Sequence, residues 1–266
     1  MRMHSNTTQR MIYIIVGASR GLGASLVSRC LKEGLEVIGI GRTDENSVVS
    51  ISDWRKTGRF KYVRTDITEP SSIIIMKSII GAYRESPACV IFNAAVIESD
   101  VDDNGNLMFD IFKRVNRTGI DGFMHVLEAF GNYLTSQKGM LVGISSISAW
   151  VPPIGGNKIA YPASKAYLDM VLRSLRLLWD KRVHIMTVHL GHIGGGGSWL
   201  VPNYDAVAQK ILDSTRCSQP PESICMSNFY CFTYRFLRIL PDRIISNIIE
   251  AIKGLLNYIP MGKTLL

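Results

Sequence analysis

Short apolar runs alternate with helix-length stretches along most of this chain. The runs are MIYIIV (11–16), EVIGIG (36–41), FKYVRT (60–65), ACVIFN (88–93), MLVGIS (140–145) and VHIMTVHL (183–190). Runs of this length and apolarity are typical of strands that are buried on both faces. Helices are expected between them, at 22–33, 71–84, 109–136 and 159–181. This alternation predicts right-handed βαβ units and a parallel sheet that binds ligands at the carboxyl ends of its strands.

Near the C-terminus, a helical pattern follows Pro241. Proline suits the first turn of a helix because its φ is fixed and it lacks an N–H. The apolar stripe that follows comprises Ile244, Ile245, Ile248, Ile249, Ile252, Leu255 and Leu256. Such a stripe packs on its own subunit, closes a substrate pocket, contacts another subunit or lies on a membrane surface. We favour a lid and interface role over the membrane, because positive charge near the stripe is sparse.

The composition favours a single globular domain over residues 1–266, since 47% of the residues are hydrophobic. The formal net charge is +8, but the basic residues are dispersed, so nucleic acid is not an expected partner. The polar first ten residues do not fit a signal peptide, and a cytoplasmic location is expected. Five cysteines without a C-x-x-C pair or ligand histidines nearby predict reduced thiols and no metal site.

The sequence GASRGLG directly follows the first apolar run and places Gly17, Gly21 and Gly23 before a predicted helix. Glycines here allow a tight turn and let the backbone approach a pyrophosphate at the helix N-terminus. A glycine-rich turn also serves close packing alone, so the motif needs support from elsewhere in the chain.

A second group of polar residues surrounds the fifth run. MLVGIS leads into Ser145 and Ser146, and a helix that begins near Ile159 places Tyr161 and Lys165 one turn apart on the same face. A Tyr-x-x-x-Lys pair arises readily by chance. The order of the motifs along the chain therefore carries more weight than the pair itself.

In this order, the motifs resemble those of the short-chain dehydrogenase/reductase family over residues 17–190. GASRGLG is similar to the family's cofactor loop, and Asp66 in DIT matches the acid that contacts adenine. FNAA keeps Asn93 and Ala94 of the family's N-N-A-G motif but loses the first Asn and the Gly. The residues that match the family's catalytic set are Asn116, Ser146, Tyr161 and Lys165.

The resemblance implies a Rossmann-type doubly wound sheet of about seven strands in three αβα layers, with a substrate-binding and C-terminal helical segment at about 194–260. It also implies an NADP(H)- or NAD(H)-dependent oxidoreductase that interconverts a carbonyl compound and an alcohol, assembled as a homodimer or homotetramer. The implied cofactor contacts are Gly17, Ser19, Arg20, Gly21, Leu22, Gly23, Arg42, Asp66, Asn93, Ala94, Tyr161, Lys165 and Ile193.

In the implied reduction, hydride from the nicotinamide reaches the carbonyl carbon and Tyr161 donates a proton to the oxygen. A free phenol has a pKa of about 10, so the Lys165 ammonium and the oxidised nicotinamide must favour the phenolate near neutral pH. Ser146 would hydrogen-bond the substrate oxygen, and Asn116 would hold a water that relays protons to Lys165.

The residue after the second run favours NADP(H) over NAD(H). An acid in this place would bind the ribose 2′-hydroxyl of NAD, whereas this chain has Arg42 there and Arg20 in the glycine loop. Two guanidinium groups suit a 2′-phosphate. Asp44 remains as the residue that would serve NAD(H).

The chain departs from the family after the sixth run, in HLGHIGGGG. Leu190 replaces the family's proline, and Gly194 and Gly195 stand where a threonine that touches the nicotinamide is expected. His192 is expected to be solvent-exposed or backbone-bonded rather than a substrate contact.

Two alternative functions stay open: a catalytically idle dinucleotide-binding regulator, and a lipid- or steroid-type reductase on a membrane surface. The substrate class stays open as well.

Overall fold

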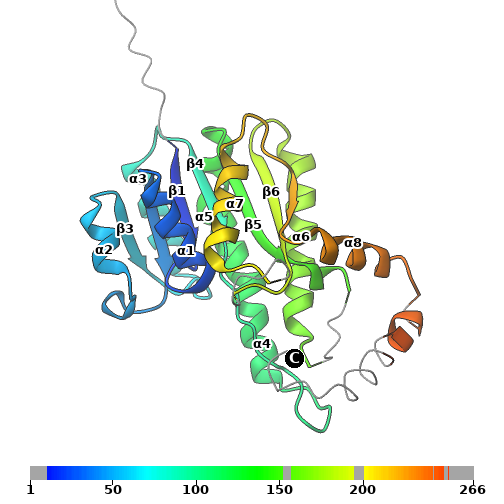
Figure 1. Ribbon diagram of the computed structural model, residues 1–266. Coiled ribbons are helices and arrows are strands. Elements are labelled where there is room, and N and C mark those ends of the chain that lie inside the picture. Colours follow the sequence, from blue (N-terminus) through cyan, green and yellow to red (C-terminus); the bar gives the residue numbers. More distant parts are fainter. Residues whose placement is uncertain (1–10, 152–156, 195–200, 242, 249–250, 252–266) are drawn as a thin grey trace, which may run out of the picture.

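The computed structural model describes residues 11–151, 157–194, 201–241, 243–248 and 251. Its centre is a parallel sheet of seven strands in the order β3-β2-β1-β4-β5-β6-β7 (Figure 1). The strands are β1 (Ile12–Val16), β2 (Glu36–Gly41), β3 (Phe60–Arg64), β4 (Ala88–Phe92), β5 (Met140–Ser146), β6 (His184–Leu190) and β7 (Ser223–Cys225). The predicted Rossmann-type sheet is confirmed.

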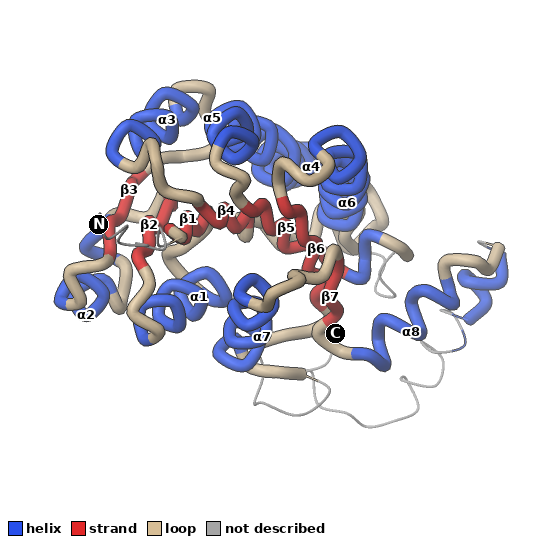
Figure 2. Tube along the Cα trace, turned by 90° about the horizontal axis from the view of Figure 1, so that it is seen from above, coloured by secondary structure: helices blue, strands red, loops and turns tan. Residues whose placement is uncertain are grey.

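Helices cover both faces of the sheet and complete three layers (Figure 2). One face carries α1 (Gly21–Lys32), α2 (Ile51–Lys56) and α7 (Tyr204–Arg216). The other face carries α3 (Ser72–Ala82), α4 (Phe109–Asn116), α5 (Gly122–Ser136) and α6 (Ala160–Trp179). Shorter segments are the 3₁₀ turns η1 (Glu45–Ser47) and η3 (Ile147–Ala149) and the π-helical η2 (Arg117–Asp121), which joins α4 to α5. The last named helix, α8 (Asn228–Leu237), extends outward from the β7 edge.

The inner strands are apolar at successive positions because helices bury both of their faces. Every residue of β1 and β4 is buried. Side chains on one face of the sheet join those of α1 and α7, such as Leu26 and Ile211, in one core cluster. Side chains on the opposite face pack with α3, α5 and α6, where Phe130 and Leu172 belong to a second cluster. The apolar stripe of each helix therefore determines which side faces the sheet.

The strand order reverses at β1. The chain runs from β1 through β2 to β3 and then returns to β4 on the other side of β1. β1 and β4 pair from Ile12 with Ala88 to Val16 with Phe92, so their carboxyl ends lie level with each other. The segments that follow these two strands therefore meet at the switch point, where open α/β sheets bind their ligands.

The structure contains the six predicted strands and the four predicted helical regions, and it adds α2, α7, α8 and β7. α7 packs against α1, and Val207, Ala208 and Ile211 are buried in the core. Within the 194–260 segment, α7 is therefore one of the helices that cover the sheet. β7 has three residues, none of them fully buried, so no apolar run marks it in the sequence.

Residues 243–248 are helical, and the carbonyl of Pro241 accepts hydrogen bonds from the backbone N–H groups of Ile244 and Ile245. In the predicted stripe, Ile245 is buried and Ile244 is exposed. Its later members, Ile249, Ile252, Leu255 and Leu256, lie outside the described residues, as does the Pro- and Gly-rich stretch 152–156. No helix among the described residues is long and apolar enough to cross a membrane.

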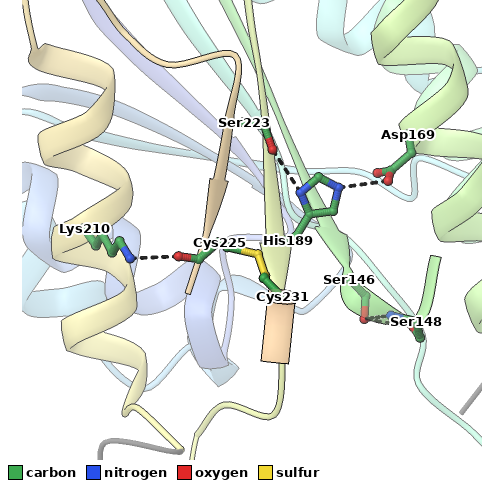
Figure 3. The surroundings of a disulfide bond; sticks show 8 residues. All are labelled: Ser146, Ser148, Asp169, His189, Lys210, Ser223, Cys225 and Cys231. Carbon is green, nitrogen blue, oxygen red and sulfur yellow. Dashed lines mark hydrogen bonds and ion pairs between the residues drawn. A yellow bond between two sulfur atoms is a disulfide. The ribbon is translucent and has the colours of Figure 1, made fainter. Parts of the chain in front are cut away.

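Cys225 and Cys231 form a disulfide that joins the end of β7 to α8 (Figure 3). The prediction of reduced thiols is wrong for this pair. The turn between the strand and the helix brings their Cα atoms within 6.3 Å, a separation that a disulfide spans. Cys30 and Cys89 are free and buried, and Cys217 is free and exposed.

Candidate active site

The turn after β1 leaves no room for side chains at two of its glycines. Gly17 has a φ of +86°, and a Cβ there would lie 2.8 Å from the Cα of Ala94. A Cβ at Gly23 would lie 1.9 Å from the carbonyl oxygen of Gly17. The side-chain amide of Asn93 donates a 3.0 Å hydrogen bond to that carbonyl and ties the turn to the end of β4. The backbone at the N-terminus of α1 is therefore held in a shape that suits a pyrophosphate.

Two arginines lie beside this turn. Arg20 is the N-cap residue of α1 and Arg42 follows β2; both are exposed, and neither forms an ion pair with a described residue. Asp44, two residues after Arg42, already has hydrogen-bond partners. It accepts a 2.8 Å hydrogen bond from Arg64 and a 3.0 Å bond from the backbone N–H of Asn46. Positive charge at the end of β2 is therefore left for an anionic ligand.

Four other residues predicted to contact a cofactor surround the glycine turn or follow β3; two of them are polar and two are apolar. The Ser19 hydroxyl accepts a 3.1 Å hydrogen bond from Thr43, which links the glycine turn to the end of β2. Asp66, just after β3, accepts a 2.9 Å bond from the backbone N–H two residues ahead. Leu22 is buried in the core, and Ile193 packs on the same cluster. These two apolar side chains pack in or against the core cluster that includes α1.

Tyr204, the first residue of α7, lies between the glycine turn and the loop after β6. A Cβ at Gly21 would lie 3.7 Å from its ring, and a Cβ at Gly194 would lie 2.5 Å from its hydroxyl. Both glycines have positive φ. His192, in the same loop, is exposed, as expected. The phenol thus occupies the space that a side chain at Gly194 would need, and it lies within van der Waals contact of the Gly21 position.

Ser145 and Ser146 end β5 with different surroundings. The Ser146 hydroxyl accepts hydrogen bonds from the backbone N–H of Ser148 at 3.2 Å and from its hydroxyl at 2.8 Å. Gly143, two residues before Ser145, faces Leu172 of α6, and strand alternation turns Ser145 to that side too. Ser146 is therefore the serine available at the end of the strand.

α6 presents Tyr161 and Lys165 one turn apart. The Lys165 Nζ lies 5.6 Å from the centroid of the Tyr161 ring. It donates a 2.7 Å hydrogen bond to the carbonyl of Ile144, two residues before Ser146. The predicted Tyr–Lys pair and the predicted serine therefore meet at the carboxyl end of β5.

A buried carboxylate fixes the start of α6. Asp100, in the segment after β4, accepts hydrogen bonds from the backbone N–H groups of Ile159 at 2.7 Å and Ala160 at 2.6 Å. Negative charge is favourable at a helix N-terminus, where the N–H groups lack partners within the helix. Asp100 thereby sets the position from which Tyr161 projects.

Burial shifts the pKa values of the two α6 groups in opposite directions. It raises the pKa of Tyr161, and the hydrogen bond with Ser146 opposes this shift. It lowers the pKa of Lys165 to about 8, and the charge of Asp169 opposes this shift. A lysine that titrates close to neutral pH beside a phenol is suited to proton exchange.

Asn116 ends α4 just before the π-helical segment η2. Its Oδ1 is buried and has no hydrogen-bond partner within the described ranges. Gly119 brings η2 close to α6, since a Cβ there would lie 2.7 Å from the Cβ of Ser164, the neighbour of Lys165. Single π-turns inside helices are frequent at functional sites. Asn116 therefore belongs to the segment that packs beside Lys165.

Four further residues beside the site escape prediction from the sequence: Asp100, Trp150, Asp169 and His189. Asp100 is 60 positions from its partner Ala160, and no local pattern links them. Asp169 has one visible signal, its spacing of four residues from Lys165 on a predicted helix. Trp150 and His189 lie beside the site only because β5 and β6 pair and α6 packs against them.

Known proteins with similar sequences and structures agree with this geometry. The family model described as short chain dehydrogenase matches residues 11–197. The serine 3-dehydrogenase of Agrobacterium fabrum (strain C58 / ATCC 33970) is 27% identical over 180 residues, which cover 67% of this chain and 70% of that protein.

Solved structures show the same fold. A short chain dehydrogenase from Burkholderia cenocepacia J2315 in complex with NADP has a TM-score of 0.73 and 18% identity, and the match covers 90% of this chain and 97% of that one. The serine dehydrogenase of Escherichia coli has a TM-score of 0.70 and 17% identity, with 81% and 96% covered. Since the family model spans more than half of the chain and includes the glycine turn and the Tyr–Lys pair, this protein belongs to the short-chain dehydrogenase family.

Proposed function

We propose that this protein is an NADP(H)-dependent oxidoreductase that interconverts a carbonyl compound and an alcohol. The observation that carries the proposal is the meeting of Ser146, Tyr161 and Lys165 at the carboxyl end of β5. Transfer of a proton to and from a substrate oxygen requires groups of this kind. A dinucleotide-binding regulator without catalysis would need only the glycine turn.

The residues around the switch point fit a dinucleotide. The backbone N–H groups of the turn and the N-terminus of α1 would hold the pyrophosphate, because Gly17 and Gly23 leave the backbone accessible there. Arg20 and Arg42 would hold a 2′-phosphate, and Asp66 would contact the adenine. NADPH would supply the hydride for the carbonyl carbon.

This chain's own residues would handle the proton. Tyr161 donates it to the substrate oxygen, to which the Ser146 hydroxyl also donates a hydrogen bond. The Lys165 ammonium stabilises the phenolate that remains. Asn116 Oδ1, which lacks a hydrogen-bond partner among the described residues, is available as an acceptor on the path that returns a proton to Lys165.

The proposal is tested by titrating the protein with NADPH, followed by fluorescence, and by following NADPH oxidation with a panel of aldehydes and ketones. The panel includes 3-oxoacyl and steroid ketones. Serine with NADP⁺ is added because serine 3-dehydrogenase is among the relatives. NADPH binding with turnover of at least one carbonyl class is expected. Binding without turnover across the panel would instead favour the idle regulator.

Cofactor choice should respond to Arg42. Replacing it with aspartate turns an attraction for the 2′-phosphate into a repulsion, so NADPH affinity should fall by about 10- to 100-fold while NADH affinity is unchanged or rises. Dissociation constants from fluorescence titration measure both effects. Arg59→Asp, with the same charge change at an exposed arginine before β3, is the matched control. Equal affinity of the wild type for NADPH and NADH would refute the assignment.

Assembly as a homodimer or homotetramer is proposed from the outer face of α6. Met170, Leu177 and Leu178 are 61%, 83% and 66% exposed, so this face of the helix presents large apolar side chains that a second subunit would cover. Tyr167, which the sequence also suggested for this face, packs against the sheet core instead.

Leu177→Glu should therefore convert the oligomer to a monomer, because it places a charge in the apolar contact. Light scattering at micromolar concentration measures the mass. Val49→Glu introduces the same charge at a residue that is 97% exposed elsewhere, and it should leave the mass unchanged. A monomeric wild type under these conditions would contradict the proposed assembly.

A further inference from the structure

Asp169 of α6, His189 of β6 and Ser223 of β7 form a chain of polar contacts (Figure 3). Asp169 follows Lys165 by four residues and lies on the same side of the helix. Its Oδ2 is 2.9 Å from Nε2 of His189 in β6. The imidazole Nδ1 is 3.2 Å from the hydroxyl of Ser223 at the start of β7. One imidazole thus connects α6, β6 and β7.

The neighbours of His189 determine its orientation. An ionised carboxylate only accepts hydrogen bonds, so Nε2 carries the proton that is donated to Asp169. In that tautomer Nδ1 accepts the hydrogen bond of the Ser223 hydroxyl. The ring of Trp150 lies against the imidazole, with centroids 4.4 Å apart, and restricts its rotation. Ring orientation and tautomer are therefore both set by contacts.

The imidazole and the neighbouring lysine are shielded from water, whereas Ser223 is exposed and the Asp169 side chain is 20% exposed. His189 is 6% exposed and Lys165 is 3% exposed. Oδ1 of Asp169 and the hydroxyl of Ser145 are buried too, and neither has a hydrogen-bond partner in the described parts of the chain. Buried polar atoms usually do have partners, and charges in such surroundings are weakly screened. The charge of Asp169 therefore acts on the Lys165 ammonium in the direction opposite to burial.

We propose that Asp169 and His189 are positioning residues for Lys165: the imidazole fixes the carboxylate, and the carboxylate keeps the buried lysine charged. In the proposed reaction the ammonium stabilises the Tyr161 phenolate, so losing the Asp169 charge weakens that support. The consequence for turnover rests on the proposed function. The effect on Lys165 itself does not.

The direction of the effect follows from the two influences on Lys165. Burial lowers its pKa to about 8, and Asp169 acts in the opposite direction. Removing the negative charge leaves burial unopposed, so the pKa falls further and the ammonium persists only at lower pH. A residue that merely filled space would not produce this shift.

Other charged groups around the pair remain the same in the test variants. Arg176 interacts electrostatically with Asp169 and is anchored by hydrogen bonds to Thr187 and to the backbone carbonyl of Glu222. The Arg235 guanidinium lies 5.3 Å from the centroid of the Trp150 ring. The titratable and charged groups near the cluster are Tyr161, Lys165 and Arg176 from α6, Glu222 from the segment before β7, and Arg235 from α8. The exposed Arg173 of α6 acts electrostatically on Arg176.

The test is an NMR pH titration of the full chain, isotopically labelled at the lysine ε-carbons, without cofactor or substrate. The variant Lys165→Met identifies the resonance. In Asp169→Asn the pKa of Lys165 should fall by about one, a tenfold change in its dissociation constant. The control is Glu128→Gln, which removes an exposed carboxylate 3.5 Å from Lys77 and should leave the Lys165 titration unchanged. An unchanged Lys165 titration in Asp169→Asn would overturn the proposal.

The role of the imidazole is tested separately. His189→Leu removes the donor to Asp169 and should lower the pKa of Lys165 in the same direction, whereas His189→Asn keeps an N–H donor and should restore most of the wild-type value. His184→Asn, at the opposite end of β6, is the matched control. If Asp169→Asn does not fold, His189→Leu still reports on the same coupling. Identical Lys165 titrations in His189→Leu and wild type would show that His189 is not a positioning residue for Lys165.

With an active carbonyl compound from the panel, kcat is measured against pH. In Asp169→Asn the limb of the profile that reports Lys165 should move to lower pH by the same amount, with KM unchanged. An equal loss of kcat at every pH, without a shift of the profile, would show that Asp169 has only a structural role. If no compound is turned over, the proposed function fails, but the titration of Lys165 still decides this inference.

Discussion

Replacing Tyr161 with phenylalanine should lower kcat by about 10²- to 10⁴-fold while NADPH binding is retained. The substitution removes the hydroxyl that donates the proton and keeps the ring that lies 5.6 Å from the Lys165 Nζ. Packing at the start of α6 is therefore preserved, and the loss reports chemistry. Steady-state kinetics with the active carbonyl compound and fluorescence titration with NADPH measure the two quantities.

Tyr167→Phe is the matched control for this experiment. Tyr167 is on the same helix, but it packs against the sheet core rather than toward Ser146 and Lys165. Loss of its hydroxyl should leave kcat close to the wild-type value. Turnover of Tyr161→Phe within a few-fold of wild type would show that another group donates the proton.

Gly23→Ala should reduce NADPH affinity by about 10- to 100-fold, because the added methyl displaces the backbone that would hold the pyrophosphate. The added methyl would lie 1.9 Å from the carbonyl oxygen of Gly17 and 2.8 Å from the amide nitrogen of Asn93. The first of these atoms is backbone and cannot turn away. The whole turn must therefore move, and it is the turn that would hold the pyrophosphate. Fluorescence titration measures the affinity, and circular dichroism confirms folding.

The control for that variant is Gly81→Ala. Gly81 lies near the end of α3, and a Cβ there meets no atom within 4 Å. Alanine should therefore be neutral or stabilise the helix by up to about 1 kcal/mol, with NADPH affinity unchanged. Thermal unfolding measures the first effect. Normal NADPH binding by Gly23→Ala would place the pyrophosphate away from this turn.

Five strands, β2, β1, β4, β5 and β6, could be predicted because inner strands buried on both faces must be apolar at successive positions. β3 was predicted as well, although it is an edge strand and none of its residues is fully buried. β7 escaped prediction because an edge strand of three partly exposed residues needs no such run. α7 escaped as well, although Val207 and Ile211 bury an apolar face against α1. Its sequence lies in a region where the family resemblance suggested a substrate pocket.

Local spacing was also enough for part of the site. Tyr161 and Lys165 share a face of α6 because residues four apart lie one above the other on any helix. Gly17 stands before α1 with a positive φ that favours glycine, and Gly23 in the first turn of α1 leaves room for the Gly17 carbonyl. These relations hold within one element, so a single stretch of residues specifies them.

The rest was decided by the tertiary structure. Asp100 holds the start of α6 across 60 residues, and His189 reaches Asp169 only because β6 pairs beside β5 under α6. The Cys225–Cys231 disulfide likewise depends on the angle at which α8 leaves β7. Periodicity records which side of an element is buried but not which neighbour buries it. Contacts between distant segments, and the pKa shifts that burial causes, exist only once the strands are ordered and the helices are packed.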